Sequence, residues 1–247
     1  SNENLYVSDE KLDRITCFDR EGELVGSWGV SGEKLGEMRR PTGLLILNDV
    51  VYVTDAMNHR IQRYHTDGRF IDQLNTTKNT ESQLRYPWGI ASGVNNDVYV
   101  ADWGNNRVVR FNQNGNFVSE LAEGIDSDMP LNKPADVAVD SEGNIYVADW
   151  GNQQLQVFDE NHNFIYMNRG EADLNRWALE YFESQQDEKR ARSSYVPVYK
   201  TDTDDVREIS ARIEPYFWDP CSVMVDGDGR TYVLETCRHR FQIFERI

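Results

Sequence analysis

One sequence pattern recurs along the chain at a nearly constant spacing, and such a repeat restricts the possible folds more strongly than any single predicted element. In each copy, a short strand containing Tyr-Val ends at a carboxylate. The copies place this carboxylate at Asp9, Asp55, Asp102, Asp149 and Glu235. The first four positions are 46 or 47 residues apart, whereas the last step is 86 residues long. The final copy is therefore preceded by an insertion of about 39 residues.

Each copy is predicted to form four short strands, named a to d in chain order. In one copy these are residues 89–91, 98–100, 108–111 and 117–118, where β-branched and aromatic side chains alternate with Gly, Asn and Asp turns. Four antiparallel strands in a repeat of this length are typical of a β-propeller blade, which packs on its neighbours around a central channel. The sequence therefore predicts an all-β propeller of four-stranded antiparallel blades, a single domain over residues 1–247.

The pattern of each copy runs from Pro-x-Gly through Tyr-Val-x-Asp-x-x-Asn-x-Arg to a Phe and a Gly-x-Phe turn. It closely resembles the NHL repeat, most clearly over residues 41–70 and 87–117. This resemblance implies a propeller that usually has six blades. Five repeats are visible, of which the first lacks strand a and the last lacks strand d. We therefore expect a six-bladed ring from which this sequence is truncated at the N-terminus.

The insertion between the fourth and fifth repeats, residues 171–215, has helical periodicity. Leu174, Trp177, Ala178, Tyr181 and Phe182 follow the spacing of one apolar helical stripe. A second short helix is predicted over about 203–214, before Pro215, with an extended segment at 195–199 between the two. We expect a lid over a ligand or a docking arm for a protein or a second copy. The alternative is a helical pair that only packs on the blades.

Chain direction alternates within a blade, so the b-to-c turns and the d-to-a connections lie on the same face of the propeller as the insertion. Loops on a rigid scaffold commonly carry binding residues. Five residues of this face are predicted to bind a ligand: Trp88, Trp103, Asp136, Trp150 and Trp218. An indole in a turn is hard to bury and suits apolar or stacking recognition. The alternative is that these rings only pack one blade on the next or lie under the insertion.

Residues that recur in equivalent turns are expected to be structural, because a single functional site rarely needs equivalent copies. The recurring sets are Asp55, Asn58 and Arg60 in one repeat and Asp102, Asn105 and Arg107 in the next. The carboxylate of each set is expected to accept hydrogen bonds from backbone amides and from the arginine. The fourth repeat departs from the pattern, since Gln154 replaces the arginine.

The charge balance restricts the partners of the chain. It carries 42 Asp and Glu against 26 Lys and Arg, a formal charge of −16. Nucleic acids are held by clustered Lys and Arg, so no nucleic-acid partner is expected. No apolar run approaches the roughly 20 residues of a membrane span, and the first residues do not form a signal segment. We therefore expect a soluble protein without membrane insertion; its compartment and oligomeric state are not specified by these features.

The three cysteines, Cys17, Cys221 and Cys237, are too few for a disulfide framework and lack a metal-binding spacing. Cys17 is expected in the core. Cys221 and Cys237 are predicted at the same face of one blade, where they form either a disulfide or two thiols.

These features together predict a non-catalytic binding or scaffold propeller that recognises a protein, a peptide or a small apolar ligand on its Trp-rich face. No catalytic residue or resident cofactor is predicted, because no nucleophile elbow, Walker loop or dinucleotide-binding Gly motif is present. Propellers that resemble this one include lactone hydrolases and lyases with a divalent metal at the channel mouth. The alternative is therefore a metal-dependent hydrolase or lyase, with Asp136, Asp219 and Glu235 as possible oxygen ligands for Ca²⁺.

Overall fold

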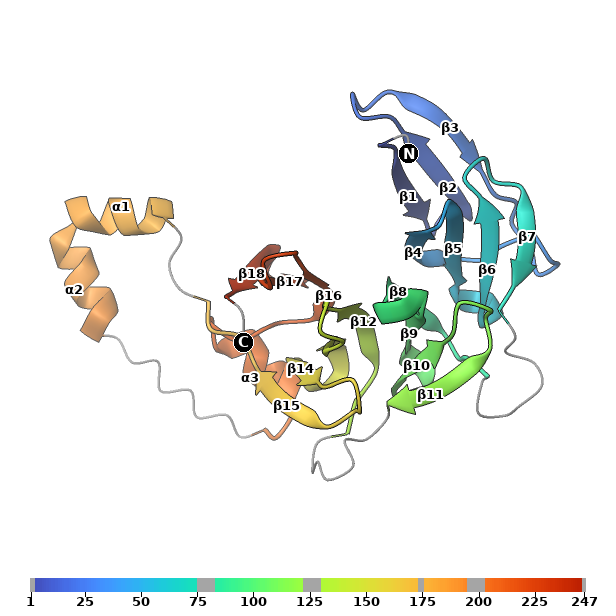
Figure 1. Ribbon diagram of the computed structural model, residues 1–247. Helices are drawn as coiled ribbons and strands as arrows, with labels where there is room; N and C mark the ends of the chain where they lie inside the picture. The colour runs from blue at the N-terminus through green and yellow to red at the C-terminus, as the bar shows by residue number, and fades with distance from the viewer. Residues whose placement is uncertain (1–2, 75–82, 122–129, 173–175, 195–202, 246–247) are drawn as a thin grey trace.

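The computed structural model describes residues 3–74, 83–121, 130–172, 176–194 and 203–245. These residues form five antiparallel sheets, one for each sequence repeat, which follow one another along an arc (Figure 1). The predicted all-β propeller of antiparallel blades is therefore confirmed. The expectation of six blades is wrong for the described residues, which form five sheets.

The strand boundaries follow the repeat. Blade 1 contains β1 (Leu5–Asp9), β2 (Arg14–Phe18) and β3 (Leu24–Trp28), and blade 2 contains β4 (Pro41–Leu47), β5 (Val50–Asp55), β6 (Arg60–His65) and β7 (Phe70–Gln73). Blade 3 contains β8 (Pro87–Ser92), β9 (Val98–Asp102), β10 (Arg107–Phe111) and β11 (Phe117–Leu121). Blade 4 contains β12 (Pro134–Val139), β13 (Ile145–Asp149), β14 (Gln154–Phe158) and β15 (Phe164–Asn168), and blade 5 contains β16 (Pro220–Val225), β17 (Thr231–Glu235) and β18 (Arg240–Phe244). As predicted, strand a of blade 1 and strand d of blade 5 are not among them.

The blades are held together by apolar cores that lie between neighbouring sheets. The strand-b tyrosine of each of blades 1 to 4 faces the following blade. Tyr52 of blade 2, for example, packs in one buried cluster with Val98 and Val109 of blade 3. Tyr99 of blade 3 and Tyr146 of blade 4 occupy the equivalent positions in the next two clusters. The same position of the repeat therefore performs the same packing role at successive interfaces.

The chain reverses between strands b and c through a short 3-10 turn directly after the strand-ending carboxylate. These turns span Ala56–Asn58, Trp103–Asn105 and Trp150–Asn152 in blades 2, 3 and 4. The residue that ends each turn has a left-handed backbone, with φ of 57° at His59 and 56° at both Asn106 and Gln153. The first residue of the turn, Trp103 or Trp150, is thereby placed at the same edge of each blade.

The described residues of the insertion form three helices: α1 (Arg176–Ser184), α2 (Gln186–Ser194) and α3 (Val206–Arg212). The first predicted helix is thus a pair, α1 and α2, and Figure 1 shows both outside the arc of sheets. Its apolar stripe is not buried, since Trp177 is 79% exposed and Tyr181 50%. Leu174 and the segment 195–199 lie outside the described residues. The second predicted helix is shorter than expected because Asp205 caps its first turn and Ile213 leaves the helical conformation.

Within the described part of the chain, no helix combines the length and apolar character needed to cross a membrane.

Candidate functional site

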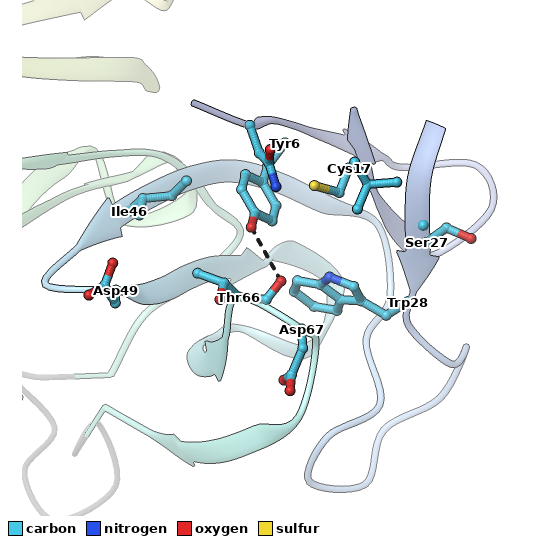
Figure 2. Close-up of a pocket in the computed structure, with 11 residues that line it drawn as sticks. Tyr6, Cys17, Ser27, Trp28, Ile46, Asp49, Thr66 and Asp67 are labelled. Atoms are coloured by element: carbon cyan, nitrogen blue, oxygen red, sulfur yellow. Dashed lines mark hydrogen bonds between the residues drawn. The ribbon is translucent and has the colours of Figure 1, made fainter. Parts of the chain in front are cut away.

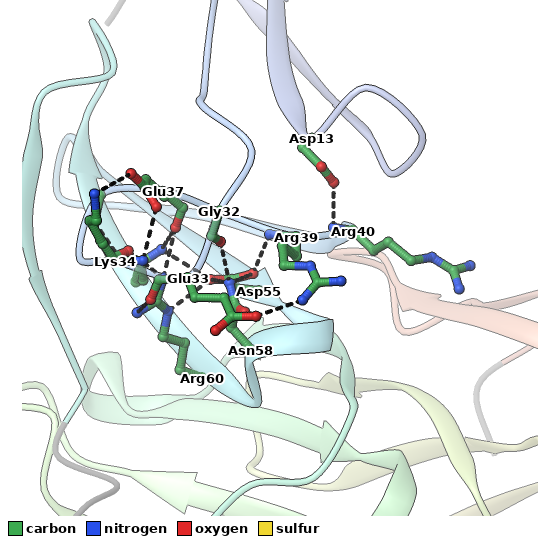
Figure 3. Close-up of polar contacts among 12 residues, drawn as sticks. Asp13, Gly32, Glu33, Lys34, Glu37, Arg39, Arg40, Asp55, Asn58 and Arg60 are labelled. Carbon is green, nitrogen blue, oxygen red and sulfur yellow. Dashed lines mark hydrogen bonds and ion pairs between the residues drawn. The ribbon is translucent and has the colours of Figure 1, made fainter.

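The strand-ending carboxylates form the framework of the face that carries the b-to-c turns, which we call the tryptophan face. Asp55 is buried and accepts hydrogen bonds from the Arg39 amide (2.7 Å), from Asn58 and from the Arg60 guanidinium (2.7 Å), as Figure 3 shows. Burial raises the pKa of Asp55, and these donors oppose that rise. The carboxylate thereby joins the turn to the preceding connection, which is the structural role predicted for it.

Blade 3 repeats this arrangement around Asp102. Its carboxylate accepts hydrogen bonds from the Arg85 amide (2.6 Å), from Asn105 (2.8 Å) and from Arg107 (2.8 Å). Such fully satisfied buried networks fix a turn in a single geometry. The aromatic residue that starts the turn is therefore held on a rigid support.

Three of the predicted site residues, Trp88 and Trp103 of blade 3 and Trp150 of blade 4, form a row on this support. The indole centroids of Trp88 and Trp103 are 6.1 Å apart, and those of Trp103 and Trp150 are 6.2 Å apart. Tyr86 extends the row, with its ring centroid 6.5 Å from that of Trp103 and 4.4 Å from that of His59. These spacings are in the range of favourable aromatic pairs. The row thus brings together tryptophans up to 62 positions apart in the chain, of which Trp103 and Trp150 occupy equivalent turn positions.

Trp218 is not part of this row. It precedes blade 5, and the Arg238 guanidinium lies over its ring at 5.6 Å. Its backbone amide donates to Glu235 at 2.9 Å. Among the described residues no ring contact joins Trp218 to the other tryptophans. Of the four predicted indoles, three therefore form the row and Trp218 lies apart from them.

Two cations that the sequence analysis did not identify lie against the row. The Lys133 ammonium is 5.0 Å from the Trp103 ring centroid and 5.9 Å from that of Trp150. The Arg207 guanidinium, which α3 contributes, is 5.7 Å from the Trp150 centroid. Both are within cation–π distance. The insertion therefore reaches the tryptophan face through α3.

The place of Lys133 on the tryptophan face could have been recognised from its position in the repeat. It directly precedes the first proline of its repeat, as Arg40, Tyr86 and Asp219 do in theirs, and all four have φ between 49° and 58°. Left-handed residues that are not glycine are uncommon, so this recurrence marks a defined position of the fold. The side chains of these four residues lie on the tryptophan face. The residue before the first proline is therefore a second position, beside the turn, where the blades present different side chains on this face.

A small apolar pocket opens beside the row. It has a volume of about 220 Å³, and its lining includes Thr42, Ala56, Met57, Tyr86, Trp88 and Trp103. Trp88 is 42% exposed there. The buried indole N–H of Trp103 has no hydrogen-bond acceptor within the described residues. The pocket therefore combines aromatic walls with the ion pair of Glu10 and Arg40, which also line it.

Asp136 lies apart from this pocket, in the central channel. A second cavity, of about 490 Å³, is lined by strand-a residues of successive blades that include Thr42, Gly89, Asp136 and Ser222. Asp136 accepts hydrogen bonds from the Ser222 hydroxyl (2.7 Å) and from the amides of Val223 (3.0 Å) and Val137 (2.9 Å). Burial nevertheless raises its pKa to about 6. Thr42 and Trp88 line both cavities, which connects Asp136 to the tryptophan row.

Glycine is needed at position 89 because the chain approaches Asp136 closely there. A Cβ atom on Gly89 would lie 2.0 Å from the Asp136 carboxylate oxygen. The Pro-x-Gly entry of this repeat therefore makes room for the channel carboxylate.

The other two carboxylates considered for Ca²⁺ are engaged elsewhere. Glu235 accepts from Arg240 (2.7 Å) and Gln242 (2.8 Å), as the equivalent carboxylates of other blades do. Burial favours a raised pKa for Asp219, but the bidentate Arg207 guanidinium, at 2.8 and 2.6 Å, lowers it below the usual value. Among the described residues, no three His, Cys, Asp or Glu side chains converge as a metal site.

All three cysteines are free thiols, and Cys17 is buried as predicted. Cys237 donates to Asp219 at 3.2 Å, and burial raises the pKa of both Cys221 and Cys237. Of the two alternatives for this pair, the structure has two thiols and no disulfide.

Comparisons with known proteins agree with the repeat. The family model of the NHL repeat matches residues 84–111 and 131–158, which contain the first three strands of blades 3 and 4. No curated protein matches the chain.

Solved structures of similar fold include two enzymes and a chain of a protein complex. Virginiamycin B lyase from Staphylococcus aureus is 14% identical with a TM-score of 0.56, and the match covers 99% of this chain and 67% of the lyase. A chain of the nidogen/laminin complex is 14% identical with a TM-score of 0.57, over 99% of this chain and 76% of its own length. A gluconolactonase from Xanthomonas campestris is 14% identical with a TM-score of 0.56, over 94% of this chain and 65% of the enzyme. At these identities the likeness shows the fold alone, and this chain spans about two thirds of the length of the two enzymes.

Proposed function

We propose, on the premise that this chain is an NHL-repeat β-propeller, that its tryptophan face binds a protein, a peptide or a small apolar ligand without catalysis. The row of Trp88, Trp103 and Trp150 carries this proposal, because it borders an apolar pocket instead of being enclosed in a core. Exposed aromatic groups on rigid loops are enriched at binding sites. The nidogen/laminin complex is one example of a propeller of this fold in a protein complex.

The polar groups around the row favour particular chemistry in the ligand. An apolar or aromatic side chain fits the pocket of about 220 Å³. Lys133 adds positive charge next to the indoles in an otherwise acidic protein, whereas Arg207 is paired with Asp219. We therefore favour a peptide that places a carboxylate near an apolar anchor.

Selection of peptides tests this function directly. A displayed library of peptides of about twelve residues is selected on the wild-type chain, and the affinity of the enriched peptides is then measured for Trp103→Ala/Trp150→Ala. Loss of a central indole costs about 2 kcal/mol, so we expect binding at least about thirtyfold weaker in the double variant.

Trp177→Ala is the matched control, since it removes an indole that is 79% exposed on α1. It should leave peptide affinity unchanged. Circular dichroism must show that the double variant stays folded. Peptides that bind wild type and the double variant equally would refute this face as the binding surface.

A hydrolase or lyase remains the second candidate because of Asp136. Its carboxyl, with a pKa raised to about 6, lies in a channel cavity of about 490 Å³, and general acids and bases work best near the operating pH. The similar structures of virginiamycin B lyase and the gluconolactonase support a test of lactone and ester substrates.

Elemental analysis of the purified protein and turnover of a lactone panel, with and without chelator, distinguish the two candidates. Suppose that the chain turns over a lactone, that Asp136→Asn abolishes this activity, and that peptide binding at the tryptophan row persists. This result would establish that the protein is an enzyme. Turnover absent under all conditions would leave the binding function alone.

A further inference from the structure

In blades 2 and 3, an arginine of strand c lies over the tyrosine paired with it on strand b. Arg63 pairs in register with Tyr52, and its guanidinium carbon is 5.8 Å from the ring centroid. Arg110 pairs with Tyr99 in the same way, at 5.7 Å. Both face the following blade. In these two blades the position therefore holds a guanidinium over an aromatic ring, whereas Val157 and Ile243 take the same place in blades 4 and 5.

Carboxylates complete the arrangement in both blades. Arg63 forms a bidentate pair with Asp72, its cross-strand partner on β7, with both N–O distances at 2.6 Å. Arg110 donates to Asp97 at 2.7 Å. The side chains of Arg63 and Arg110 are only 20% and 27% exposed, so these guanidinium groups fill the interface.

Blade 1 keeps the tyrosine but lacks the groups that fill the space beside it. Tyr6 pairs with Cys17, and Cys17 pairs with Gly26, in the places that Arg63 and Asp72 take in blade 2. A Cβ atom added to Gly26 would meet nothing within 4 Å. The result is a pocket of about 550 Å³ between blades 1 and 2, which Figure 2 shows around Tyr6 and Cys17.

The walls of this pocket have the chemistry that binds a cation. The Tyr6 hydroxyl donates to the Thr66 carbonyl at 3.3 Å, which holds the ring in place. Trp28 adds a second aromatic wall (Figure 2). Asp49 and Asp67, from two turns of blade 2, add two carboxylates, of which Asp67 also pairs with Arg69 at 2.8 Å.

We propose that this inter-blade pocket binds a guanidinium group supplied from outside the blades, either as a free alkylguanidine or as the arginine side chain of a peptide. The ligand takes the place that Arg63 and Arg110 occupy in the next two blades, over the Tyr6 ring. A planar guanidinium stacks on aromatic rings and pairs with carboxylates, which is the combination present here. The turns that carry Asp49 and Asp67 lie on the propeller face opposite the tryptophan row, so this site is separate from the proposed function.

Calorimetric titration with matched probes tests the proposal. N-ethylguanidinium and N-ethylurea have nearly the same shape but differ in charge, so we expect the guanidinium to bind at least about tenfold more tightly. Equal affinity, or no binding of any guanidinium probe, would overturn the proposal. The peptide acetyl-Gly-Arg-Gly-amide distinguishes the sources: tighter binding than ethylguanidinium assigns the ligand to a protein side chain, and weaker binding assigns it to a small molecule.

Two variants locate the binding. Cys17→Arg with Gly26→Asp fills the pocket with the same pair that blade 2 carries, so this variant should fold and lose at least about tenfold in affinity for ethylguanidinium. Asp49→Asn with Asp67→Asn removes surface charge and should weaken binding by a similar factor. Glu160→Gln, on a turn of blade 4 at the same face, is the control and should bind like wild type. Unchanged affinity in the filled variant would exclude this pocket.

Discussion

Asp149 shows how one residue of the repeat changes the electrostatics of a turn. Gln154 stands where Arg60 and Arg107 pair with the carboxylates of blades 2 and 3. Asp149 instead accepts hydrogen bonds from side-chain amides, which include Asn152 at 2.6 Å and Gln156 at 2.8 Å. Burial raises its pKa to about 6. A neutral donor set thus leaves most of the cost of burying the charge uncompensated.

Gln154→Arg should restore the missing ion pair. In blade 3, the Arg107 guanidinium also reaches the Gln83 carbonyl at 2.8 Å, and the Pro130 carbonyl occupies the equivalent place in blade 4, where it accepts from Asn152. We expect the variant to raise the free energy of unfolding at pH 7 by about 1 to 2 kcal/mol, measured by urea denaturation. Gln113→Arg, at an exposed turn of blade 3, is the control and should change stability by less than about 0.5 kcal/mol.

The stability that Gln154→Arg adds should depend on pH, because protonation of Asp149 is linked to folding. The Asp149 carboxyl holds its proton below about pH 6 in the folded protein, but only below about pH 4 when unfolded. Between these values the folded state binds more protons, so the contribution of Asp149 to stability falls as the pH rises toward 6. The advantage of Gln154→Arg over wild type should therefore be small at pH 4 and grow up to about pH 7. A constant difference at all pH values would contradict this account.

At the scale of elements, two arginines fix α3 on blade 5. Arg207 in the first turn of α3 pairs with Asp219, the residue before β16. Arg238, from the turn between β17 and β18, donates to the carbonyls of Ser210 (2.8 Å) and Ile213 (3.0 Å) at the other end of the helix. A helix of seven residues is not stable alone in water, so these contacts determine whether it stays docked.

Arg238→Met should release the C-terminal end of α3 while the blades stay folded. Hydrogen bonds from a charged donor contribute about 1.5 to 3 kcal/mol, so amide exchange over residues 206–213 should accelerate at least about tenfold by mass spectrometry. Arg212→Met, which removes only an exposed pair with Glu208 on the same helix, should have little effect. Unchanged exchange in Arg238→Met would show that other contacts hold the helix.

The elements that could be predicted from the sequence are those that the repeat defines. The spacing of the carboxylates located strands b and c of each blade and brought Trp88, Trp103 and Trp150 to one face. The insertion has no repeat to guide it. The stripe containing Trp177 was compatible with a lid, a docking arm or a helical pair packed on the blades, and in the structure Trp177 is 79% exposed. Lys133 and Arg207 were missed because their contacts join segments whose distance depends on the whole fold.

At the scale of the whole molecule, the arc of blades ends in two apolar faces. Phe241 of blade 5 is 60% exposed, whereas Ile61 and Leu155, at the same position of β6 and β14, are fully buried. Ile243 and Met224 are exposed on the same sheet, and Leu5 and Val7 are exposed on blade 1. In blades 2 to 4 a neighbouring blade covers the equivalent positions. Neighbouring apolar side chains exposed in this way favour association.

We therefore expect the 247-residue chain to self-associate through its end blades. Sedimentation velocity should show oligomers that increase with protein concentration, and Phe241→Glu/Met224→Glu should shift the chain to a monomer. Because a net charge of −16 makes the copies repel one another, association should strengthen as salt screens that repulsion. Trp177→Glu places the same charge on the exposed face of α1 and should leave association unchanged if the blades mediate it. A wild-type chain that stays monomeric at high salt and high concentration would contradict this prediction, since the apolar end faces would then not drive contact between copies.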